Sequence, residues 1–543
     1  MKHKRLLLLT GLTGVLLALP WFEYFSGIIL LIAFVPLLFV EDYLFLKKDV
    51  NRPYLAFGYA LTAFFIWNVL STFWIAKISF GGAFIVILFN SFLLALVFFL
   101  YHLTKRNLGR NFGNFSLLVY WIGWEYLFMN AEITWPWLNL GNGFAKDVGL
   151  IQWYEFTGVL GGTLWILVIN LVLFNIFKFY IINRSIRAQL GQVLFFLILL
   201  FLPITVSLIA FNSYRINTKP VKIGILQPNI DPYDEKFEKL SQAKQTRIML
   251  NLADSVVDFH MDYLVGPETV LSKLNLDSLT QHESIHSFDN LVQKYPDLHI
   301  ILGIDGYRNF QTKAEAPPTA RQRDDAQGLY SVYNSSIQID TSRKYPVYHK
   351  SRLVSGVEKM PYVSHVRFFE NFILDIGGTK GSKTVQKTRE NFSSLDSETS
   401  VAPVICYESV FGEYVSSYVR KGADVIFILT NDGWLRSPGY MQHLHFARLR
   451  AIETRRDIAR SANTGISAFI NQKGELLKTT EWWERNAFKG TLNAHHEQTF
   501  YVEYGDYIGR VSTFLAVFAL LYLIAKVLMR STKNAEKLLR LRE

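Results

Sequence analysis

Long apolar stretches alternate with short polar segments in the first 211 residues, and one more apolar stretch lies near the C-terminus. Stretches of about 17–25 mainly apolar residues are long enough to cross a bilayer as helices. The predicted spans cover about 6–19, 25–40, 54–75, 82–103, 115–129, 159–180, 190–211 and 511–528. The first two are short and close together, which indicates a helical hairpin. We therefore predict eight membrane helices.

Between residues 219 and 505 the pattern changes to short, β-branched apolar runs that alternate with amphipathic segments. The runs lie at 221–230, 261–270, 299–307, 329–340, 344–354, 401–409 and 423–434. Strands that alternate with helices predict a layered α/β domain. We therefore expect an N-terminal membrane domain with seven transmembrane helices (1–218), an α/β domain (219–505), and a C-terminal transmembrane helix with a basic tail (506–543).

Composition and charge agree with this division. Half of the residues are hydrophobic and the formal net charge is +11. Lys and Arg gather before the first predicted span, between spans two and three, four and five, and six and seven, and after the eighth. If every span crosses, these segments all face one side, which the positive-inside rule identifies as the cytoplasm. Both termini are then cytoplasmic, the α/β domain is outside, and no nucleic-acid partner is expected.

Two membrane segments have alternative interpretations. The first span follows the basic residues of MKHKR, as a cleaved signal peptide would, but no small-x-small cleavage site precedes Pro20. We expect it to be retained as a helix. The outer loop ITWPWLNLGNGFA (133–145) is rich in Trp, Pro and Gly. It is either an aromatic anchor at the membrane interface or a re-entrant, lipid-contacting segment.

Cys406 is the only cysteine in the chain, which excludes an internal disulfide and a thiolate zinc cluster. Glu268, Lys350 and Cys406 each lie near the end of a predicted strand, where sites gather in α/β folds. A carboxylate can take the thiol proton, and a lysine can favour the thiolate and stabilise an oxyanion. The backbone N–H of Tyr407 is a candidate second oxyanion donor. Together these groups suit acyl transfer through a thioester. Taken singly, each has a simpler interpretation as a packing or surface residue.

The sequence gives no sign of a cofactor. It contains no phosphate-binding glycine motif and no metal-ligand spacing. His443 and His445 lie two residues apart without a third ligand in sight, and we interpret them as ordinary polar residues rather than metal ligands.

Five motifs carry a family resemblance: GPET (266–269), YHKSRLVSGVE (348–358), ICYE (405–408), LTNDGW (429–434) and RAIETRRDIARSANTGIS (450–467). In these motifs the chain resembles the nitrilase, or carbon–nitrogen hydrolase, superfamily. With seven predicted spans before this domain and one after it, the whole chain resembles the apolipoprotein N-acyltransferases of bacterial inner membranes. The resemblance implies an αββα sandwich in which Glu268 is the general base, Lys350 the oxyanion stabiliser and Cys406 the nucleophile.

The same resemblance implies further site residues. Glu358 matches a second essential glutamate, and Tyr407 and Glu408 match residues that activity requires beside the nucleophile. The family usually has Pro-Phe-Gly before the second glutamate, whereas this chain has Ser355-Gly356-Val357. A tryptophan that the family has after the first strand is not matched in this chain. Phe237 is the nearest aromatic residue, and we expect it to contact lipid.

The reaction implied by the resemblance is acylation of the free amino group of a lipoprotein's diacylglyceryl-cysteine. A phospholipid donates the acyl chain in a ping-pong scheme, without a cofactor, on the periplasmic side of the inner membrane, and we expect a monomer. One alternative is a membrane-tethered amidase that hydrolyses small amides with the same triad. Another is a transporter or receptor, which needs functional ionisable groups within its spans. The spans contain few, and Glu125 is the clearest.

Overall fold

The computed structural model describes residues 3–48, 52–185, 189–216, 219–233, 235, 240–323, 328–359 and 382–540. Its internal contacts divide the chain into two compact units. One unit comprises Met1–Ala210 together with Asp506–Glu543, and the other comprises Phe211–Gly505. The C-terminal helix therefore belongs to the same unit as the N-terminal helices.

The first unit is helical. Its helices are α1 (His3–Ala18), α2 (Leu30–Ala33), α3 (Val35–Leu46), α4 (Tyr54–Thr72), α5 (Phe80–Leu108), α6 (Arg110–Asn130), α7 (Tyr154–Asn183), α8 (Leu190–Ser213) and α14 (Tyr507–Arg540). Seven helical segments in the described part of the chain are long and apolar enough to cross a membrane. The predicted fifth span forms a 21-residue helix, α6, but is not among these seven. Its first turns carry Arg, Asn and Gly, which lower its hydropathy.

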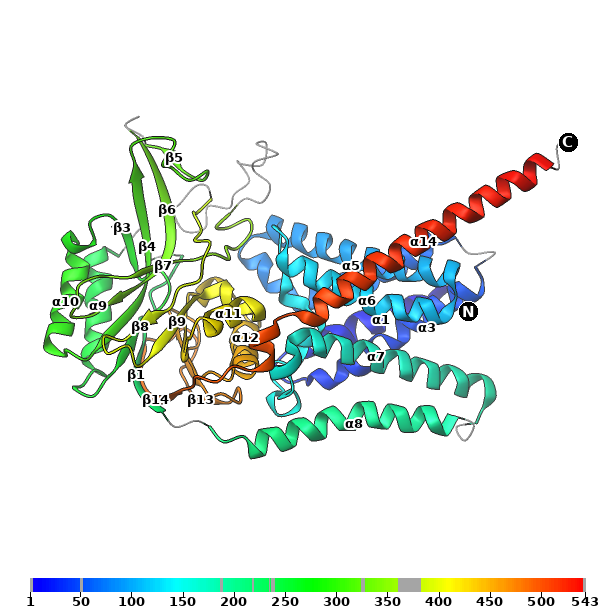
Figure 1. Ribbon diagram of the computed structural model, residues 1–543, viewed down its shortest axis with the longest axis horizontal. Coiled ribbons are helices and arrows are strands. Elements are labelled where there is room, and N and C mark those ends of the chain that lie inside the picture. The colour runs from blue at the N-terminus through cyan, green and yellow to red at the C-terminus, as the bar shows by residue number, and fades with distance from the viewer. Residues whose placement is uncertain are drawn as a thin grey trace. The chain divides into compact units, whose positions relative to one another are not determined.

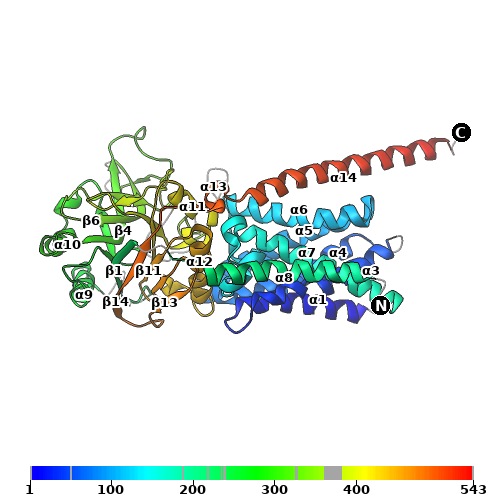
Figure 2. The ribbon, with the colours of Figure 1, turned by 60° about the horizontal axis from the view of Figure 1, so that its bottom comes forward.

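The helices of this unit run side by side, as α1, α4, α5, α6 and α7 do in Figure 2. In α1, a Cβ on Gly14 would lie 2.6 Å from the carbonyl oxygen of Ala63, so α1 packs closely against α4. α7 is interrupted at Gly158, where φ is +59°. Only 6% of the residues in the apolar stretch of α8 are buried, and the side chains that it exposes are almost entirely hydrophobic. A helix of this kind is suited to contact with lipid.

The loop before α7 is folded into the unit as short 3₁₀ turns, η4 (Pro136–Leu138), η5 (Leu140–Phe144) and η6 (Val148–Leu150). Glu125 accepts hydrogen bonds from the backbone N–H of Leu140 at 2.9 Å and the hydroxyl of Thr163 at 2.7 Å. Trp137 in this loop is 2% exposed. Non-helical backbone is tolerated at membrane depth where protein covers it and pairs its polar groups. Glu125 therefore has a structural role in holding the loop.

More ionisable side chains are buried among the helices than the hydrophobic pattern indicated. Glu41 pairs with His102 at 2.8 Å and also with Lys105, and Asp42 pairs with Lys178 at 2.6 Å. The physical reason is that α3 and α5 continue past the predicted apolar stretches, which ended near residues 40 and 103, and so bring Glu41, Asp42 and Lys105 into the helices. His102 and Lys178 lie near the ends of their predicted stretches and pair with these carboxylates. Opposite charges brought together in this way lower the cost of burying each one.

The second unit contains two β-sheets. The first sheet has the order β14-β1-β2-β4-β6-β5, with β3 beside β4 and β7 beside β6. Its strands are β1 (Lys219–Gln227), β2 (Tyr263–Val265), β3 (Leu271–Asn275), β4 (His299–Phe310), β5 (Arg321–Gln322), β6 (Leu329–Ile339), β7 (Val347–His349) and β14 (Asn486–Ala494). The second sheet has the order β13-β12-β11-β10-β9-β8. Its strands are β8 (Phe392–Ser393), β9 (Ser400–Ile405), β10 (Val425–Thr430), β11 (Ile458–Ala462), β12 (Ala468–Ile470) and β13 (Leu476–Thr479).

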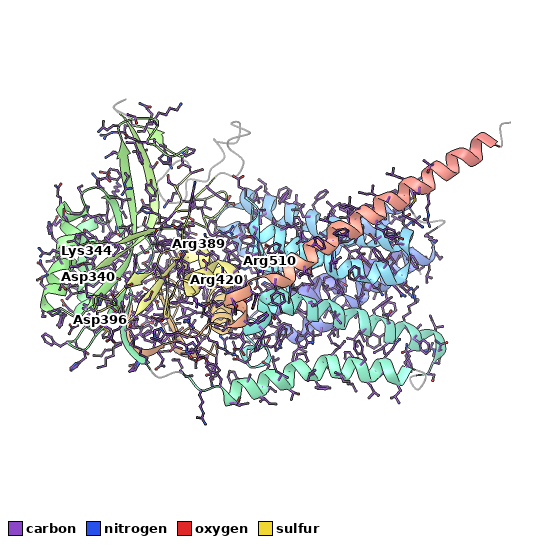
Figure 3. The ribbon with its side chains drawn as sticks, in the orientation of Figure 1. Asp340, Lys344, Arg389, Asp396, Arg420 and Arg510 are labelled. Carbon is purple, nitrogen blue, oxygen red and sulfur yellow. The ribbon has the colours of Figure 1, made fainter. Side chains whose placement is uncertain are left out.

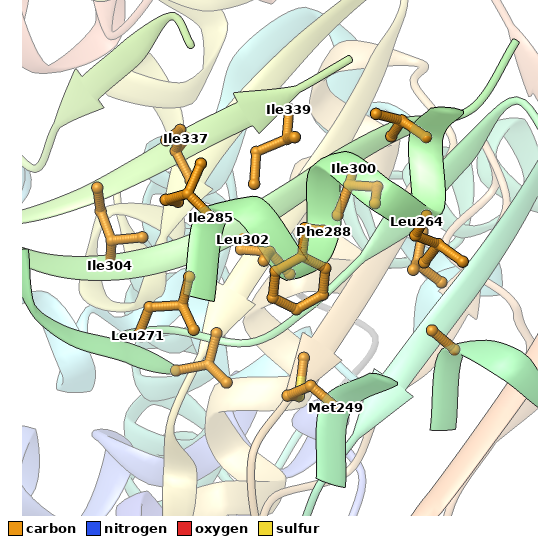
Figure 4. Packing of buried hydrophobic residues seen from close by; sticks show 14 of the residues in the cluster. Met249, Leu264, Leu271, Ile285, Phe288, Ile300, Leu302, Ile304, Ile337 and Ile339 are labelled. Atoms are coloured by element: carbon orange, nitrogen blue, oxygen red, sulfur yellow. The ribbon is translucent and has the colours of Figure 1, made fainter. Parts of the chain in front are cut away.

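Helices cover each sheet. Helices α9 (Gln242–Asp254) and α10 (Glu283–Lys294) lie along the first sheet, whereas α11 (Gly412–Arg420) and α12 (Gly439–Thr454) accompany the second (Figure 1). Figure 4 shows Met249 of α9 and Phe288 of α10 packed against Leu264, Ile300 and Leu302 of β2 and β4. These apolar side chains are fully buried, which removes them from water and fixes the helices on the sheet.

The two sheets face each other across a second buried layer. The rings of Tyr263 in β2 and Phe427 in β10 meet edge to face at 5.3 Å. The hydroxyl of Ser461 in β11 donates to the carbonyl of Leu226 in β1 at 2.7 Å. The unit is therefore an αββα sandwich, and the predicted fold class, an α-helical membrane domain together with an α/β sandwich domain, is confirmed.

Candidate active site

Three side chains expected to act together lie just beyond the ends of strands. Glu268 follows β2, Lys350 follows β7 and Cys406 follows β9. The backbone N–H of Lys350 donates to the carbonyl of Asn334 at 2.8 Å, which continues the pairing of β7 with β6. Strand pairing thus fixes the main chain of Lys350.

Glu268 lies directly against β4 because Gly303 has no side chain. A Cβ on Gly303 would lie 2.5 Å from the Cα of Glu268 and 2.6 Å from the carbonyl oxygen of Pro267. The N–H of Gly303 donates to that same carbonyl at 3.0 Å. Any larger residue at this position would displace the backbone that carries the Glu268 carboxylate.

Lys350 joins two carboxylates. Its Nζ lies 2.9 Å from Oε1 of Glu268 and 2.9 Å from Oε2 of Glu358. All three side chains are buried. Burial disfavours the ammonium form, but the two carboxylates outweigh it and raise the pKa of Lys350 well above its usual value. Burial likewise opposes the charge on Glu358, but Lys350 outweighs it and lowers the pKa of this carboxyl. Lys350 is therefore cationic and Glu358 anionic at neutral pH, and we call these two groups together with Glu268 the charged cluster.

Asn334, in the middle of β6, is a bridging residue that the sequence motifs did not indicate. Its Nδ2 donates to Oε1 of Glu268 at 2.7 Å and to Oε1 of Glu358 at 2.8 Å. The side chain is 2% exposed. Hydrogen bonds from one amide hold both carboxylates in the orientation in which they contact Lys350.

Cys406 occupies a strained turn between β9 and the 3₁₀ helix η11 (Cys406–Val410). Its φ is +49°, in the left-handed region that residues with a Cβ rarely adopt. Such strain persists where the surrounding structure enforces it, and it is common at functional sites. Here the hydroxyl of Ser409 donates to the carbonyl of Cys406 at 2.7 Å. At Cys406 the chain thus leaves β9 and enters η11.

The Cys406 thiol lies in the field of the charged cluster. Burial raises its pKa most, and Glu268 raises it further, whereas Lys350 lowers it. Asp432 also raises this pKa, and a hydrogen bond from Thr430 lowers it. The resting sulfur is therefore a protonated thiol, and forming the nucleophilic thiolate requires a nearby base.

Glu408 connects the segments that carry Cys406 and Lys350. Its Oε2 accepts from the N–H of Ile405 at 2.9 Å, and its Oε1 accepts from the N–H of Ser351 at 2.7 Å. Oε1 also accepts from the hydroxyls of Tyr348 and Tyr414 at 2.8 and 2.6 Å. The residue before Cys406 and the residue after Lys350 are thus both hydrogen-bonded to the Glu408 carboxylate.

An arginine packs on one of the two tyrosines that bind the Glu408 carboxylate. The guanidinium of Arg389 lies 4.2 Å from the ring centre of Tyr414. Figure 3 labels Arg389 and Arg420 near α11, and Arg420 donates to the carbonyl of Val502 at 2.6 Å. The ring of Tyr414, whose hydroxyl binds Glu408, is therefore packed against the guanidinium of Arg389.

Tyr407 is 5% exposed, and its ring meets that of Phe411 edge to face at 5.2 Å. Burial raises the pKa of its hydroxyl, and Arg352 and Lys350 oppose that rise. The side chain of Tyr407 is therefore buried in the structure beside Cys406.

The segment that departs from the family pattern forms a tight turn. Gly356 has a φ of +81°, and its N–H donates to the carbonyl of Lys359 at 2.8 Å. The N–H of Val354 donates to Oε2 of Glu358 at 3.0 Å. The turn thus returns the Glu358 carboxylate toward Lys350. Phe237, expected as a lipid contact, lies outside the described residues.

His443 is more than the ordinary polar residue that we expected. It is 2% exposed, and its Nδ1 lies 2.9 Å from Oδ1 of Asp432. Its Nε2 lies 3.1 Å from the hydroxyl of Ser409, which holds the Cys406 carbonyl. The two-residue spacing between His443 and His445 did not indicate these contacts. Asp432 and Ser409 lie on other elements of the fold, so only the tertiary structure brings them to His443. Within the described ranges, no group of three or more His, Cys, Asp or Glu side chains is placed to hold a metal ion.

Comparison with known proteins identifies both parts of the chain. Residues 222–499 match the carbon–nitrogen hydrolase family, and residues 13–172 match the apolipoprotein N-acyltransferase N-terminal domain. An apolipoprotein N-acyltransferase of Chlorobaculum tepidum is 27% identical over 508 residues, which cover 92% of each chain. That of Thermotoga maritima is 26% identical over 543 residues, which cover 94% of this chain and 92% of the relative.

Among solved structures, an amidase from Nesterenkonia sp. aligns with a TM-score of 0.36 at 12% identity, over 52% of this chain and 93% of that one. The family match spans more than half of the present chain, including the strands that precede Glu268, Lys350 and Cys406. The chain therefore belongs to the carbon–nitrogen hydrolase family, and ahead of that domain it carries the N-terminal domain of the apolipoprotein N-acyltransferases.

Proposed function

We propose that this acyltransferase moves a fatty acyl chain from a membrane phospholipid to the free N-terminal amino group of the diacylglyceryl-cysteine of apolipoproteins. Relatives over about nine-tenths of the chain bear the name apolipoprotein N-acyltransferase, which supports lipoprotein N-acylation. The observation that carries the mechanism is the buried contact of Lys350 with Glu268, whose charges both act on the Cys406 thiol. A base, a cation and a nucleophile are the groups that a thioester route needs.

In the first half-reaction, Glu268 takes the proton from Sγ of Cys406. The thiolate attacks the carbonyl carbon of a phospholipid ester, and the carbonyl oxygen becomes an oxyanion. Collapse of this intermediate breaks the ester bond, and the lysophospholipid alkoxide leaves with the proton held by Glu268. The acyl chain remains on Sγ as a thioester.

The hydrogen bonds of Lys350 suit it to stabilise the oxyanion. An ammonium has three N–H donors, and the contacts with Glu268 and Glu358 use two of them. The third is available for the substrate oxygen, together with the backbone N–H of Tyr407. When Glu268 is protonated, Glu358 still balances the charge of Lys350. The second glutamate therefore keeps the lysine cationic throughout the cycle.

In the second half-reaction, the amino group of the acceptor attacks the thioester carbonyl. Glu268 takes the ammonium proton, the carbon–sulfur bond breaks, and Cys406 regains a proton as the thiol. An ester is converted into a thioester and then into an amide, so the last step is downhill and requires no nucleotide. Both substrates use one thiol in turn, which is a ping-pong scheme.

The location proposed for this chemistry is the periplasmic side of the bacterial inner membrane. Donor and acceptor are both anchored in lipid, and the helical unit offers exposed apolar helices such as α8 to that lipid. An oxidising compartment also suits a nucleophile without a second cysteine, because no internal disulfide can trap it.

The test is acyl transfer from a labelled phospholipid to a diacylglyceryl-cysteine peptide by the full-length protein in detergent. We expect Cys406→Ala to abolish the labelled product while the protein still inserts into membranes and keeps its melting temperature. Persistent transfer by Cys406→Ala would refute the thioester route. Ammonia release from small amides without any lipid requirement would favour the amidase alternative.

A further inference from the structure

Thr430 lies beside Cys406 at the ends of two paired strands, and neither its motif nor its position suggested a role. It ends β10, and Leu429 before it pairs in parallel register with Ile405, the residue before Cys406. The two strand ends therefore lie side by side. The hydroxyl of Thr430 donates to Oδ1 of Asp432 at 2.8 Å, and its interaction with the Cys406 side chain lowers the pKa of the thiol.

A second path leads from Asp432 to the same cysteine. Oδ1 of Asp432 contacts Nδ1 of His443 at 2.9 Å, and Nε2 of His443 lies 3.1 Å from the hydroxyl of Ser409. Ser409 donates to the carbonyl of Cys406 at 2.7 Å. Asp432 therefore reaches the sulfur through Thr430 and the backbone of the strained turn through His443 and Ser409.

Both paths are closed to water. Thr430 and Asp432 are each 0% exposed, and Ser409 and His443 are also buried. Arg460 pairs with Oδ2 of Asp432. Burial opposes the charge of Asp432, but Arg460 and His443 outweigh it and hold the pKa of this carboxyl well below its usual range. Asp432 is therefore a buried, ionised carboxylate that can accept hydrogen bonds, and its contacts with His443 and Arg460 hold it in place.

The number of hydrogens then limits what Thr430 can do. A hydroxyl has one proton, so Thr430 cannot donate to Asp432 and to sulfur at once. While Cys406 is a thiol, its S–H can donate to Oγ1 of Thr430, and Thr430 donates to Asp432. Once the thiol proton has moved to Glu268, the thiolate can only accept. The Thr430 proton can then turn to the sulfur, while Asp432 keeps its contacts with His443 and Arg460.

We propose that Thr430 is a further catalytic residue, whose hydroxyl accepts a hydrogen bond from the resting thiol and donates one to the thiolate. In the resting state the Thr430 hydroxyl donates its hydrogen bond to Asp432 instead. His443 and Ser409 are positioning residues that hold the Cys406 carbonyl. The proposal rests on the proposed function in one respect, namely that Glu268 removes the thiol proton. No proton is gained or lost in the switch, because only the Thr430 O–H changes direction.

The proposal predicts that changes at Thr430 and at Asp432 shift the pKa of the Cys406 thiol in opposite directions. The charged groups that act on Cys406 are Glu268, Lys350 and Asp432. Removing the Thr430 hydroxyl takes away a donor to the thiolate, so the thiol pKa rises. Removing the negative charge of Asp432, which itself raises that pKa, makes the thiol pKa fall. A general loosening of the site would hydrate the sulfur and lower the pKa in both variants.

The experiment uses the single cysteine of the full-length protein in detergent. The rate of alkylation of Cys406 by iodoacetamide is followed by intact mass spectrometry across a pH series, because only the thiolate reacts. In Thr430→Val we expect the rate at a fixed pH below the thiol pKa to fall about tenfold, the effect of one hydrogen bond to a charged group. In Thr430→Ser, which restores the hydroxyl, the profile should return toward that of the wild type.

Two further variants complete the design. Asp432→Asn should shift the profile to lower pH, opposite to Thr430→Val, and the exposed Thr388→Val is the matched control that leaves the profile unchanged. Asp432→Asn removes the partner of Arg460, so if it does not fold, the Thr430→Val and Thr430→Ser pair decides. A wild-type profile in Thr430→Val, or a shift to lower pH, would overturn the proposal. Alkylation of the free thiol requires no acyl donor, so this result does not depend on whether phospholipid acylates Cys406 during the reaction cycle.

Discussion

Asn334 shows how a neutral side chain can organise charges. It places one N–H on each of the two carboxylates that flank Lys350, at 2.7 and 2.8 Å. Two buried carboxylates repel each other unless donors and a cation hold them. Lys350 supplies the charge, and Asn334 supplies the fixed geometry that keeps Glu268 directed at its partner.

We therefore expect Asn334→Ala to slow acyl transfer by about 10–100-fold, because each lost hydrogen bond to a charged group is worth about 1.5–3 kcal/mol. The measurement is the transfer rate at saturating donor, with the melting temperature recorded for each variant. Asn486→Ala, on the edge strand β14, is the matched control and should transfer at the wild-type rate. A wild-type rate in Asn334→Ala would show that Glu268 is oriented without it.

The residues of the site differ in how far the sequence could predict them. Glu268, Lys350 and Cys406 follow predictable strands, and their chemistry forms one coherent set. Asn334 lies in the middle of β6 among small polar residues, so nothing in the local pattern distinguishes it. Its contact with Glu358 depends on the turn at Gly356, and that of His443 with Asp432 depends on how α12 packs. Such contacts arise from tertiary structure, which periodicity does not encode.

At the scale of elements, the loop before α7 depends on close backbone contact. A Cβ on Gly141 would lie 2.1 Å from the carbonyl oxygen of Val159, one residue after the break in α7. The hydroxyl of Tyr154 donates to the carbonyl of Gly141 at 3.0 Å. The loop and the first turns of α7 therefore form one packed element that only a glycine allows.

Gly141→Ala should consequently lower the melting temperature of the detergent-solubilised protein, since the methyl group must displace backbone rather than a flexible side chain. We expect a loss of about 1–3 kcal/mol, as for other overpacked sites. Gly149→Ala in the same loop is the matched control, because its new Cβ would meet its nearest atom only at 3.8 Å. Equal melting temperatures for the two variants would contradict this account of the loop.

The sequence predicted the type of most elements but not their arrangement. Alternating strands and amphipathic helices indicated the α/β unit, and the long apolar runs indicated the membrane helices. The order β14-β1-β2-β4-β6, in which the last strand joins the first, depends on pairing over more than 250 residues of sequence. The hydrophobic pattern also did not predict where some helices end. Helices α3 and α5 extend into charged turns, whose side chains Glu41 and Lys105 pair with each other.

At the scale of the whole molecule, the charge pattern of the loops carries a topological prediction. Exposed lysines test it: Lys48 lies beyond α3, and Lys344 lies between β6 and β7 (Figure 3). The positive-inside rule places the first in the cytoplasm and the second outside.

We expect Lys344→Cys, in a Cys406→Ala background, to react with a membrane-impermeant maleimide in right-side-out membrane vesicles. Lys48→Cys should react only after detergent opens the vesicles. The Cys406→Ala protein alone is the control and contains no thiol. The reverse labelling pattern would place the carbon–nitrogen hydrolase domain in the cytoplasm.

The central claim is that Cys406 carries the acyl chain between two substrates. Its most direct test is intact mass spectrometry of the protein incubated with phospholipid and no acceptor. We predict an added mass equal to one fatty acyl chain, located on Cys406, released by neutral hydroxylamine, and lost when a diacylglyceryl-cysteine peptide is added. A protein that acylates the peptide while Cys406 stays unmodified at every time point would contradict the account.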